Sequence, residues 1–230
     1  MPHVDDDAAA SAVGLRVIAP ERPGFGLSDP FPGHTVAGWA DDAEQLLDHL
    51  GVPGVAVVGG SGGGPFAVAV AALLPHRVSA LALVASGVPG PALNADELAR
   101  IERGRLTARG EQVAALVRED PEAFRAATGI TPNPWWTAML VEAFRQGPNG
   151  YVEDHLLNAT DWSPLLSRVA APVRAWHGAD DDNIRVESVR WMLDRLPGAE
   201  LTEIEGAGHD IGDHWPQVLR WLRDNAPSSP

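Results

Sequence analysis

The stretch that decides the fold is residues 55–70, which read VAVVGGSGGGPFAVAV. Val55–Val58 is an apolar run typical of a buried strand, and the run from Pro65 to Leu74 is typical of an apolar helix. Between them stands G-x-S-x-G, at Gly59–Gly63. A strand, a tight turn and a helix in this order lift the central serine above the end of a sheet. The pattern therefore predicts an exposed, activated hydroxyl at Ser61.

Two other interpretations of glycine-rich turns in this chain are disfavoured by the residues around them. A phosphate-binding loop needs Gly-Lys-Ser/Thr, and no such triplet follows the glycines at 59–64. The turn at Gly24–Gly26 lacks the third glycine of a dinucleotide fingerprint. The sequence therefore predicts no cofactor.

Apolar runs and helical periodicities alternate on both sides of the serine turn. We predict further strands at 15–19, 80–85, 173–177 and 201–204, and further helices at 39–50, 186–196 and 215–225. Residues 88–170 show helical periodicities without a convincing strand. Strand and helix in alternation indicate a parallel sheet covered on both faces. The predicted fold is α/β, a mostly parallel doubly wound sheet, with a core at 1–87 and 171–230 and a helical cap at 88–170.

A serine hydroxyl needs a base at neutral pH, and the chain offers eight histidines. His209 ends the run Gly-Ala-Gly-His, directly after the predicted strand at 201–204. A histidine in a loop at the carboxyl end of a strand can reach over the sheet to Ser61. His177 sits at the end of a strand, where a structural role is the simpler interpretation, and the remaining histidines fit loops or helix surfaces. We therefore predict His209 as the base.

Three consecutive aspartates, Asp180, Asp181 and Asp182, follow the predicted strand at 173–177. They precede His209, as the chain order serine, acid, histidine requires. The acid would fix the tautomer of the imidazole and stabilise its charged form. Composition alone does not choose among the three. A metal site at this run would need a second cluster of ligands, which the sequence lacks, so no metal is expected.

Four stretches together carry a resemblance to a known family: 16–28 (RVIAPERPGFGLS), the serine turn, 172–178 (PVRAWHG) and 206–209 (GAGH). On these residues the chain resembles cofactor-free α/β-hydrolases with a single helical cap, over nearly its whole length. In that family the acid stands three residues after the glycine of the His-Gly pair. The resemblance therefore implies Asp181 as the acid, with Asp180 and Asp182 as alternatives.

The start of the chain departs from that family. Its members carry two or three strands upstream of a segment like 15–19, and the last strand leads into a His-Gly loop that supplies a second oxyanion donor. Only Met1–Gly14 precede the segment in this chain, and they contain no His-Gly pair. We therefore expect that Met1 is not the start of a complete catalytic domain.

Composition limits the classes of partner. A net charge of −14 disfavours nucleic acid and anionic membrane surfaces, both of which need basic protein surface. The chain contains no uninterrupted run of about 18 apolar residues, which is the length that a helix needs to span a bilayer. The first residues do not form a signal peptide, so a cytoplasmic location is expected by default. The expected partner is a small-molecule substrate, and the oligomeric state is left open.

Together these features predict a serine hydrolase that cleaves a carboxylic ester or a related acyl compound. Ser61 would attack the carbonyl, His209 would move the proton, Asp181 would orient His209, and the N–H of Gly62 would hold the oxyanion. The candidates for an apolar substrate wall are Trp135, Trp136, Trp162 and Phe124, for each of which core packing is an equal alternative.

Other activities remain open at this point. Aminopeptidase, lactonase, carbon–carbon bond hydrolase and cofactor-free haloperoxidase chemistry use the same arrangement. A relative without catalytic activity that binds a small apolar ligand is the alternative from a different class. The incomplete start of the chain favours that alternative, while the intact serine, aspartate and histidine set disfavours it.

Overall fold

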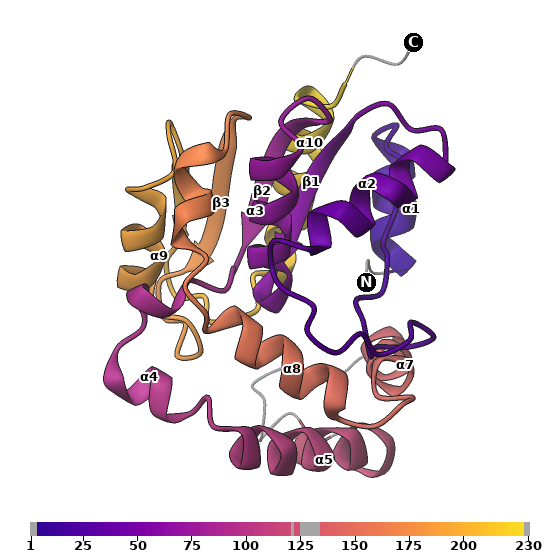
Figure 1. Ribbon diagram of the computed structural model, residues 1–230, viewed down its shortest axis with the longest axis vertical. Helices are drawn as coiled ribbons and strands as arrows, with labels where there is room; N and C mark the ends of the chain where they lie inside the picture. Colours follow the sequence, from indigo (N-terminus) through magenta and orange to yellow (C-terminus); the bar gives the residue numbers. More distant parts are fainter. Residues whose placement is uncertain (1–3, 121, 125–133, 228–230) are drawn as a thin grey trace. The chain divides into compact units, whose positions relative to one another are not determined.

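The computed structural model describes residues 4–120, 122–124 and 134–227 (Figure 1). The chain falls into two compact units. The sheet unit comprises residues 35–94 and 158–230, and the helical unit comprises residues 1–34 and 95–157. Residues 1–34, which the sequence pattern assigns to the core, thus group with the helices of the predicted cap.

The sheet unit is built on four parallel strands in the order β1-β2-β3-β4. Their bounds are β1 Val55–Gly60, β2 Val78–Val84, β3 Val173–Gly178 and β4 Glu200–Ile204. β2 lies in the interior of the sheet and is buried along almost its whole length, whereas β4 at one edge exposes Glu200 and Glu203. The strand pattern of the sequence predicted all four of these strands to within two residues at either end.

Helices cover both faces of this sheet. They are α2 Trp39–His49, α3 Gly64–Leu73, α9 Val186–Leu193 and α10 Trp215–Asp224. α3 and α10 both pack against β1 and β2, α3 in front of the strands and α10 behind them in Figure 1. Two edge-to-face ring contacts connect these elements: Trp39 of α2 lies 6.2 Å from Phe66 of α3, and Trp176 of β3 lies 5.8 Å from Trp221 of α10, between ring centroids. The predicted covered parallel sheet is therefore confirmed.

The helical unit contains α1 Val4–Ala12, α4 Ala95–Ala99, α5 Arg103–Glu119, α7 Pro134–Ala143 and most of α8 Asn149–Asn158. One cluster of buried apolar side chains in this unit consists of Val113, Val117, Phe124 and Phe144. Short 3-10 turns complete the described chain: η1 Ser61–Gly63, η2 Gly90–Ala92, η3 Ser163–Arg168 and η4 Gly212–His214.

The strand predicted at Leu15–Ala19 is wrong, because these residues belong to no strand of the structure. Their apolar side chains are only partly buried. A strand is stable only when a neighbour pairs with its backbone, and an apolar run does not reveal whether such a neighbour exists. Among the described residues β1 has β2 as its single sheet neighbour, so β1 is an edge strand, and Val58 in it is 43% exposed.

Helix length and hydropathy bear on the membrane question. The longest helix among the described residues, α5, has 17 residues and carries charged side chains along its length. Within residues 4–120, 122–124 and 134–227, no helix combines the length and the apolar character that crossing a membrane requires.

Candidate active site

Ser61 directly follows β1 and is the first residue of η1, in the sharp turn from the strand to α3 that the G-x-S-x-G pattern predicts. Its φ is +46°, in the left-handed region that side chains rarely adopt. Such a conformation persists only where the surrounding structure enforces it. The turn also explains the glycine two residues earlier, since a Cβ on Gly59 would lie 2.6 Å from the Cβ of Ala67 and 2.8 Å from the carbonyl oxygen of Gly63.

The turn that follows β2 supports this strained serine. The N–H of Gly87 donates to the Ser61 carbonyl oxygen at 2.8 Å, and so does the N–H of Gly64 at the start of α3. Ala85, in the same turn, has a φ of +43°, so two neighbouring strands both end in a left-handed residue. Ser86 packs directly against Gly64, where a Cβ would overlap its hydroxyl. The residues that follow β2 thus hold the backbone of Ser61 in place.

His209 lies beyond β4, and its Nε2 is 2.9 Å from the Oγ of Ser61. The loop that carries it packs against the end of β3 at Gly178, where a Cβ would overlap the carbonyl oxygens of Ala207 and Gly208. The N–H of Asp180 donates to the Ala207 carbonyl oxygen at 2.9 Å. The glycine of the His-Gly pair is therefore needed to bring the histidine loop and the aspartate loop together.

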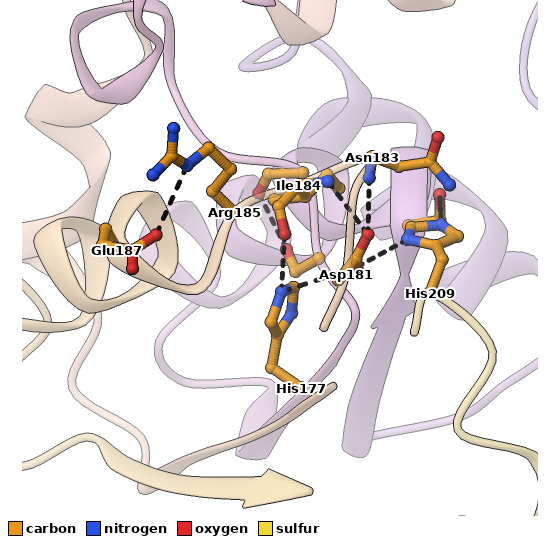
Figure 2. A network of polar contacts seen from close by, with 10 residues as sticks. His177, Asp181, Asn183, Ile184, Arg185, Glu187 and His209 are labelled. Atoms are coloured by element: carbon orange, nitrogen blue, oxygen red, sulfur yellow. Dashed lines mark hydrogen bonds and ion pairs between the residues drawn. The ribbon is translucent and has the colours of Figure 1, made fainter. Parts of the chain in front are cut away.

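Asp181 is the aspartate that faces the histidine (Figure 2). Its side chain is fully buried, and its Oδ2 lies 2.8 Å from Nδ1 of His209. Its Oδ1 accepts from the backbone N–H groups of Asn183 at 2.8 Å and Ile184 at 3.0 Å. Asp180 and Asp182 are exposed. Burial therefore distinguishes Asp181 from Asp180 and Asp182, which composition alone leaves equivalent.

These contacts set the charge of Asp181. Burial by itself would raise the pKa of the carboxyl, because desolvation disfavours its ionised form. The hydrogen bond and charge of His209, with the N–H groups of Ile184 and Asn183, outweigh that effect and leave the pKa of Asp181 below its ordinary value. The carboxylate is therefore ionised at neutral pH, facing the imidazole.

A second histidine, His177, lies beside the same carboxylate. It is fully buried near the end of β3, with its Nε2 2.8 Å from the Ile184 carbonyl oxygen and 3.5 Å from Oδ2 of Asp181. Sequence reasoning assigned it a structural role and missed this contact. The signal was available, because His177 precedes Asp181 by four residues across a single tight turn.

Gly62 and Asn158 complete the surroundings of the serine. Gly62 is the second residue of η1, and the first N–H groups of a helix have no acceptor within it, which suits the predicted role of this N–H. The side-chain nitrogen of Asn158, the last residue of α8, lies 3.3 Å from the Gly62 carbonyl oxygen. Nothing in the local sequence pattern pointed to Asn158.

The residues predicted to form a substrate wall lie in different places. Trp162 is 4% exposed in the sheet unit, and its indole N–H donates to the Asn158 carbonyl oxygen at 3.0 Å. Phe124 is 1% exposed in the core of the helical unit. Trp135 and Trp136 begin α7, and their side chains lie outside the described part of the structure. Contact with substrate stays a prediction for all four.

The arrangement can perform acid–base chemistry at a serine without a metal. Among the described residues, no group of three histidine or acidic side chains is placed to hold a metal ion. The hydrogen bonds instead join hydroxyl, imidazole and carboxylate in sequence, the order in which a proton can leave the hydroxyl while the carboxylate stabilises the imidazolium.

The model of one protein family, described as the alpha/beta hydrolase fold, matches residues 1–213. This chain belongs to that family. The resemblance inferred from the serine turn and the Gly-Ala-Gly-His run is thereby confirmed. Across the hydrolase fold, sites at the carboxyl ends of the strands carry many different reactions, so membership fixes the fold rather than the substrate.

Similar proteins include enzymes that are named as hydrolases. The 2-hydroxymuconate semialdehyde hydrolase of Pseudomonas putida is 29% identical over 212 residues, which cover 88% of this chain and 72% of that protein. The bifunctional esterase/perhydrolase of Acinetobacter calcoaceticus is 28% identical over 213 residues, covering 86% and 76%. A solved esterase from Exiguobacterium antarcticum is 19% identical, with a TM-score of 0.69 over 97% of this chain and 87% of that one, and shows the shared fold. These relatives support a hydrolytic enzyme.

Proposed function

We propose that this chain hydrolyses carboxylic esters or related acyl compounds of small-molecule size, with Ser61 as nucleophile, His209 as base and Asp181 as its partner. The observation that carries the proposal is the continuous contact from Oγ of Ser61 to Nε2 of His209 at 2.9 Å, and from Nδ1 of His209 to Oδ2 of Asp181 at 2.8 Å. The left-handed φ of Ser61 at the end of β1 supports it, because this turn presents the hydroxyl.

In the proposed reaction, Oγ of Ser61 bonds to the carbonyl carbon while its proton passes to Nε2 of His209. The carbonyl oxygen becomes an oxyanion, to which the N–H of Gly62 donates. His209 then gives the proton to the leaving group as the bond to that group breaks, which leaves an acyl-serine. Water repeats the sequence and releases the acid.

Asp181 contributes to both halves of this cycle. Its carboxylate accepts from Nδ1–H of His209, so Nε2 is free to take the serine proton. Because the pKa of Asp181 lies below its ordinary value, it stays ionised while the imidazole becomes positively charged. Its own charge is stabilised by the two backbone N–H groups at Oδ1.

The proposal is tested by labelling with a fluorophosphonate and by measuring hydrolysis of p-nitrophenyl esters with acyl chains of increasing length. We expect one covalent adduct at Ser61 and turnover of at least part of the ester series. Ser61→Ala removes the hydroxyl and little else, so it should abolish labelling and turnover while the circular dichroism spectrum is unchanged.

An adduct on Ser28 or Ser86 would show that the nucleophile is assigned wrongly. A chain that binds esters without labelling or turnover would instead be the ligand-binding relative without catalytic activity. Peptide mapping of the adduct and a binding titration with the Ser61→Ala variant separate these two outcomes.

Carbon–carbon bond hydrolysis is a second candidate, favoured by the similarity to the 2-hydroxymuconate semialdehyde hydrolase of Pseudomonas putida. The same serine could attack a carbonyl whose leaving group is carbon. Adding 2-hydroxymuconate semialdehyde to the ester series decides between the two. A kcat/KM for it at least tenfold above that for the best ester would favour the second candidate.

A further inference from the structure

We propose that His177 is a positioning residue for the catalytic aspartate: as a neutral imidazole it anchors the turn that aims Asp181 at His209. The inference rests on the proposed function, because it concerns the same site. It gives the buried His177 a role in the reaction that acts through Asp181 and not through direct contact with the nucleophile, Ser61.

The hydrogen-bond partners of His177 determine its tautomer. Nε2 lies 2.8 Å from the Ile184 carbonyl oxygen, and a carbonyl can only accept, so Nε2 must carry a proton. Nδ1 is buried and has no hydrogen-bond partner among the residues that the structure describes. A proton on Nδ1 would therefore be desolvated without an acceptor, which favours the neutral ring with its single proton on Nε2.

The proton on Nε2 of His177 holds Ile184 in place through the carbonyl oxygen of that residue. Ile184 uses both of its backbone groups: its carbonyl accepts from His177, and its N–H donates to Oδ1 of Asp181 at 3.0 Å. Figure 2 shows His177 on the side of the turn away from His209, with Asp181 between the two rings. Anchoring Ile184 therefore fixes the donor that orients one oxygen of Asp181, which leaves the other oxygen facing His209.

A neutral imidazole suits this position because two histidine rings lie close to one oxygen of Asp181. Oδ2 of Asp181 is 2.8 Å from Nδ1 of His209 and 3.5 Å from Nε2 of His177. A second positive charge at 3.5 Å would compete with His209 for the carboxylate. Burial is the main cause that lowers the pKa of His177, against the raising effects of the Ile184 carbonyl and of Asp181, so the ring stays uncharged at neutral pH.

The titratable groups that act on His177 come from three elements. Asp181 lies on the turn after β3, His209 on the loop after β4, and Glu203 on β4 itself. Glu203 is engaged by Arg190 of α9 at 2.6 Å, which leaves Asp181 as the carboxylate in direct reach of the ring. The expected effects of substitution are therefore transmitted through Asp181.

Three substitutions at this position separate positioning from packing. His177→Gln keeps an N–H at about the place of Nε2. His177→Phe keeps the ring and loses the donor, and His177→Asn keeps an amide that is too short to reach the Ile184 carbonyl. Trp176→Phe is the matched control, because the neighbouring side chain points to the other face of the sheet and packs on Trp221.

The measurements are kcat and KM between pH 5 and 9 on the best ester, with melting temperature as the check on folding. We expect His177→Phe and His177→Asn to lower kcat by roughly 10- to 100-fold with less than about a threefold change in KM. The acid limb of the kcat/KM profile should move to lower pH, because the imidazolium of His209 loses part of its carboxylate contact. His177→Gln should restore kcat to within about threefold of the wild type, and Trp176→Phe should lower the melting temperature with kcat and the acid limb unchanged.

A readout without substrate keeps this inference separate from the proposed function. The Nδ1 proton of His209, bonded to Asp181, should give a far-downfield proton NMR signal in the wild type and in His177→Gln, and the signal should be lost or shifted in His177→Asn. If the wild type hydrolyses no ester, the proposed function fails while this signal still tests the role of His177. Unchanged kcat, acid limb and NMR signal in folded His177→Asn would overturn the inference, as would a His177→Gln variant as impaired as His177→Asn.

Discussion

Long-range polar contacts join different kinds of residues in the sheet unit and in the helical unit. In the sheet unit, whose strands and helices pack apolar side chains against one another, they connect Ser61, His209 and Asp181. In the helical unit, which also has an apolar cluster, they connect segments that are distant in sequence. Arg22 forms a two-pronged ion pair with Asp154 of α8 at 2.7 and 2.8 Å, across 132 residues of sequence.

Several polar contacts of the helical unit involve the loop at residues 21–28. The side-chain amide of Gln146 donates to the carbonyl oxygens of Gly26 and Ser28 at 2.9 and 2.8 Å. Gly24 approaches α8 so closely that a Cβ on it would lie 3.0 Å from the Cα of Gly150. Backbone contact and hydrogen bonds thus connect this loop to α8 and to Gln146.

This difference predicts whether a substitution should change the reaction or the stability of the chain. The hydrogen bonds that join Ser61, His209 and Asp181 all lie within the sheet unit, so changes there should act on the reaction. Changes to the ion pair in the helical unit should act on stability. Four predictions test this division, beginning with the largest expected effect.

Asp181→Asn should lower kcat by about 10⁴-fold, because an amide facing Nδ1 favours the wrong imidazole tautomer. Asp180→Asn and Asp182→Asn are the matched controls and should each cost less than about tenfold, as expected for exposed side chains. Steady-state kinetics on one ester compares the three. A large loss at Asp180 with a small one at Asp181 would move the assignment by one residue.

Gly178→Ala should lower kcat by about 10²-fold, since its Cβ would push the loop of Ala207 and Gly208 away and carry His209 with it. Gly208→Ala is the control from the other side of the same contact, because its nearest atom would be the Asp180 carbonyl oxygen at an ordinary 3.9 Å. The rate of fluorophosphonate labelling reports both. Equal rates in the two variants would show that this approach does not set the position of His209.

Asp154→Asn should lower the free energy of unfolding by about 2–3 kcal/mol, because it removes the carboxylate charge that pairs with the part-buried guanidinium of Arg22. The estimate is at the low end for a buried pair, since Arg22 is 24% exposed. The neighbouring Glu153→Gln breaks an exposed pair with Arg103 and should cost less than about 1 kcal/mol.

Urea unfolding measures both of these variants, and labelling of Ser61 provides the second half of the test. If the division between units holds, Asp154→Asn should change the labelling rate by less than about threefold under conditions where the chain is folded. A labelling rate that falls as far as that of Gly178→Ala would contradict the division.

The smallest expected effect is a dependence of stability on pH. Burial lowers the pKa of His177 in the sheet unit and of His155 in the helical unit. Below about pH 6.5 the unfolded chain binds a proton at each site and the folded chain does not, so the free energy of unfolding falls as the pH decreases from there. His177→Gln and His155→Gln should each flatten this fall in urea titrations at pH 5 to 7. A steeper fall in either variant would mean that the sign is wrong.

Local sequence patterns predicted most of the strands and helices of the sheet unit. The serine turn was predictable because Gly59, Ser61 and the flanking strand and helix are contiguous in sequence. The choice of Asp181 over its neighbours was not available from the residues alone, because three adjacent aspartates have the same composition and differ only in burial. The family resemblance supplied that choice.

The remaining misses have one physical cause, which is that they depend on partners far away in the chain. The strand predicted at Leu15–Ala19 needs a neighbour that apolarity does not reveal. The contact of Asn158 with Gly62 spans 96 residues, and the pair of Arg22 and Asp154 spans 132. No local periodicity records such contacts.

Two of the close glycine contacts of the sheet unit, at Gly64 and Gly178, differ in whether a second substitution could relieve them. A side chain at position 64 would meet the side chain of Ser86, so a second change from Ser86 to glycine could make room for it. A side chain at position 178 would meet the backbone carbonyl oxygens of Ala207 and Gly208, which no substitution removes. A selection for second-site suppressors should therefore recover revertants of Gly64→Ala at position 86, whereas Gly178→Ala should return almost only by true reversion.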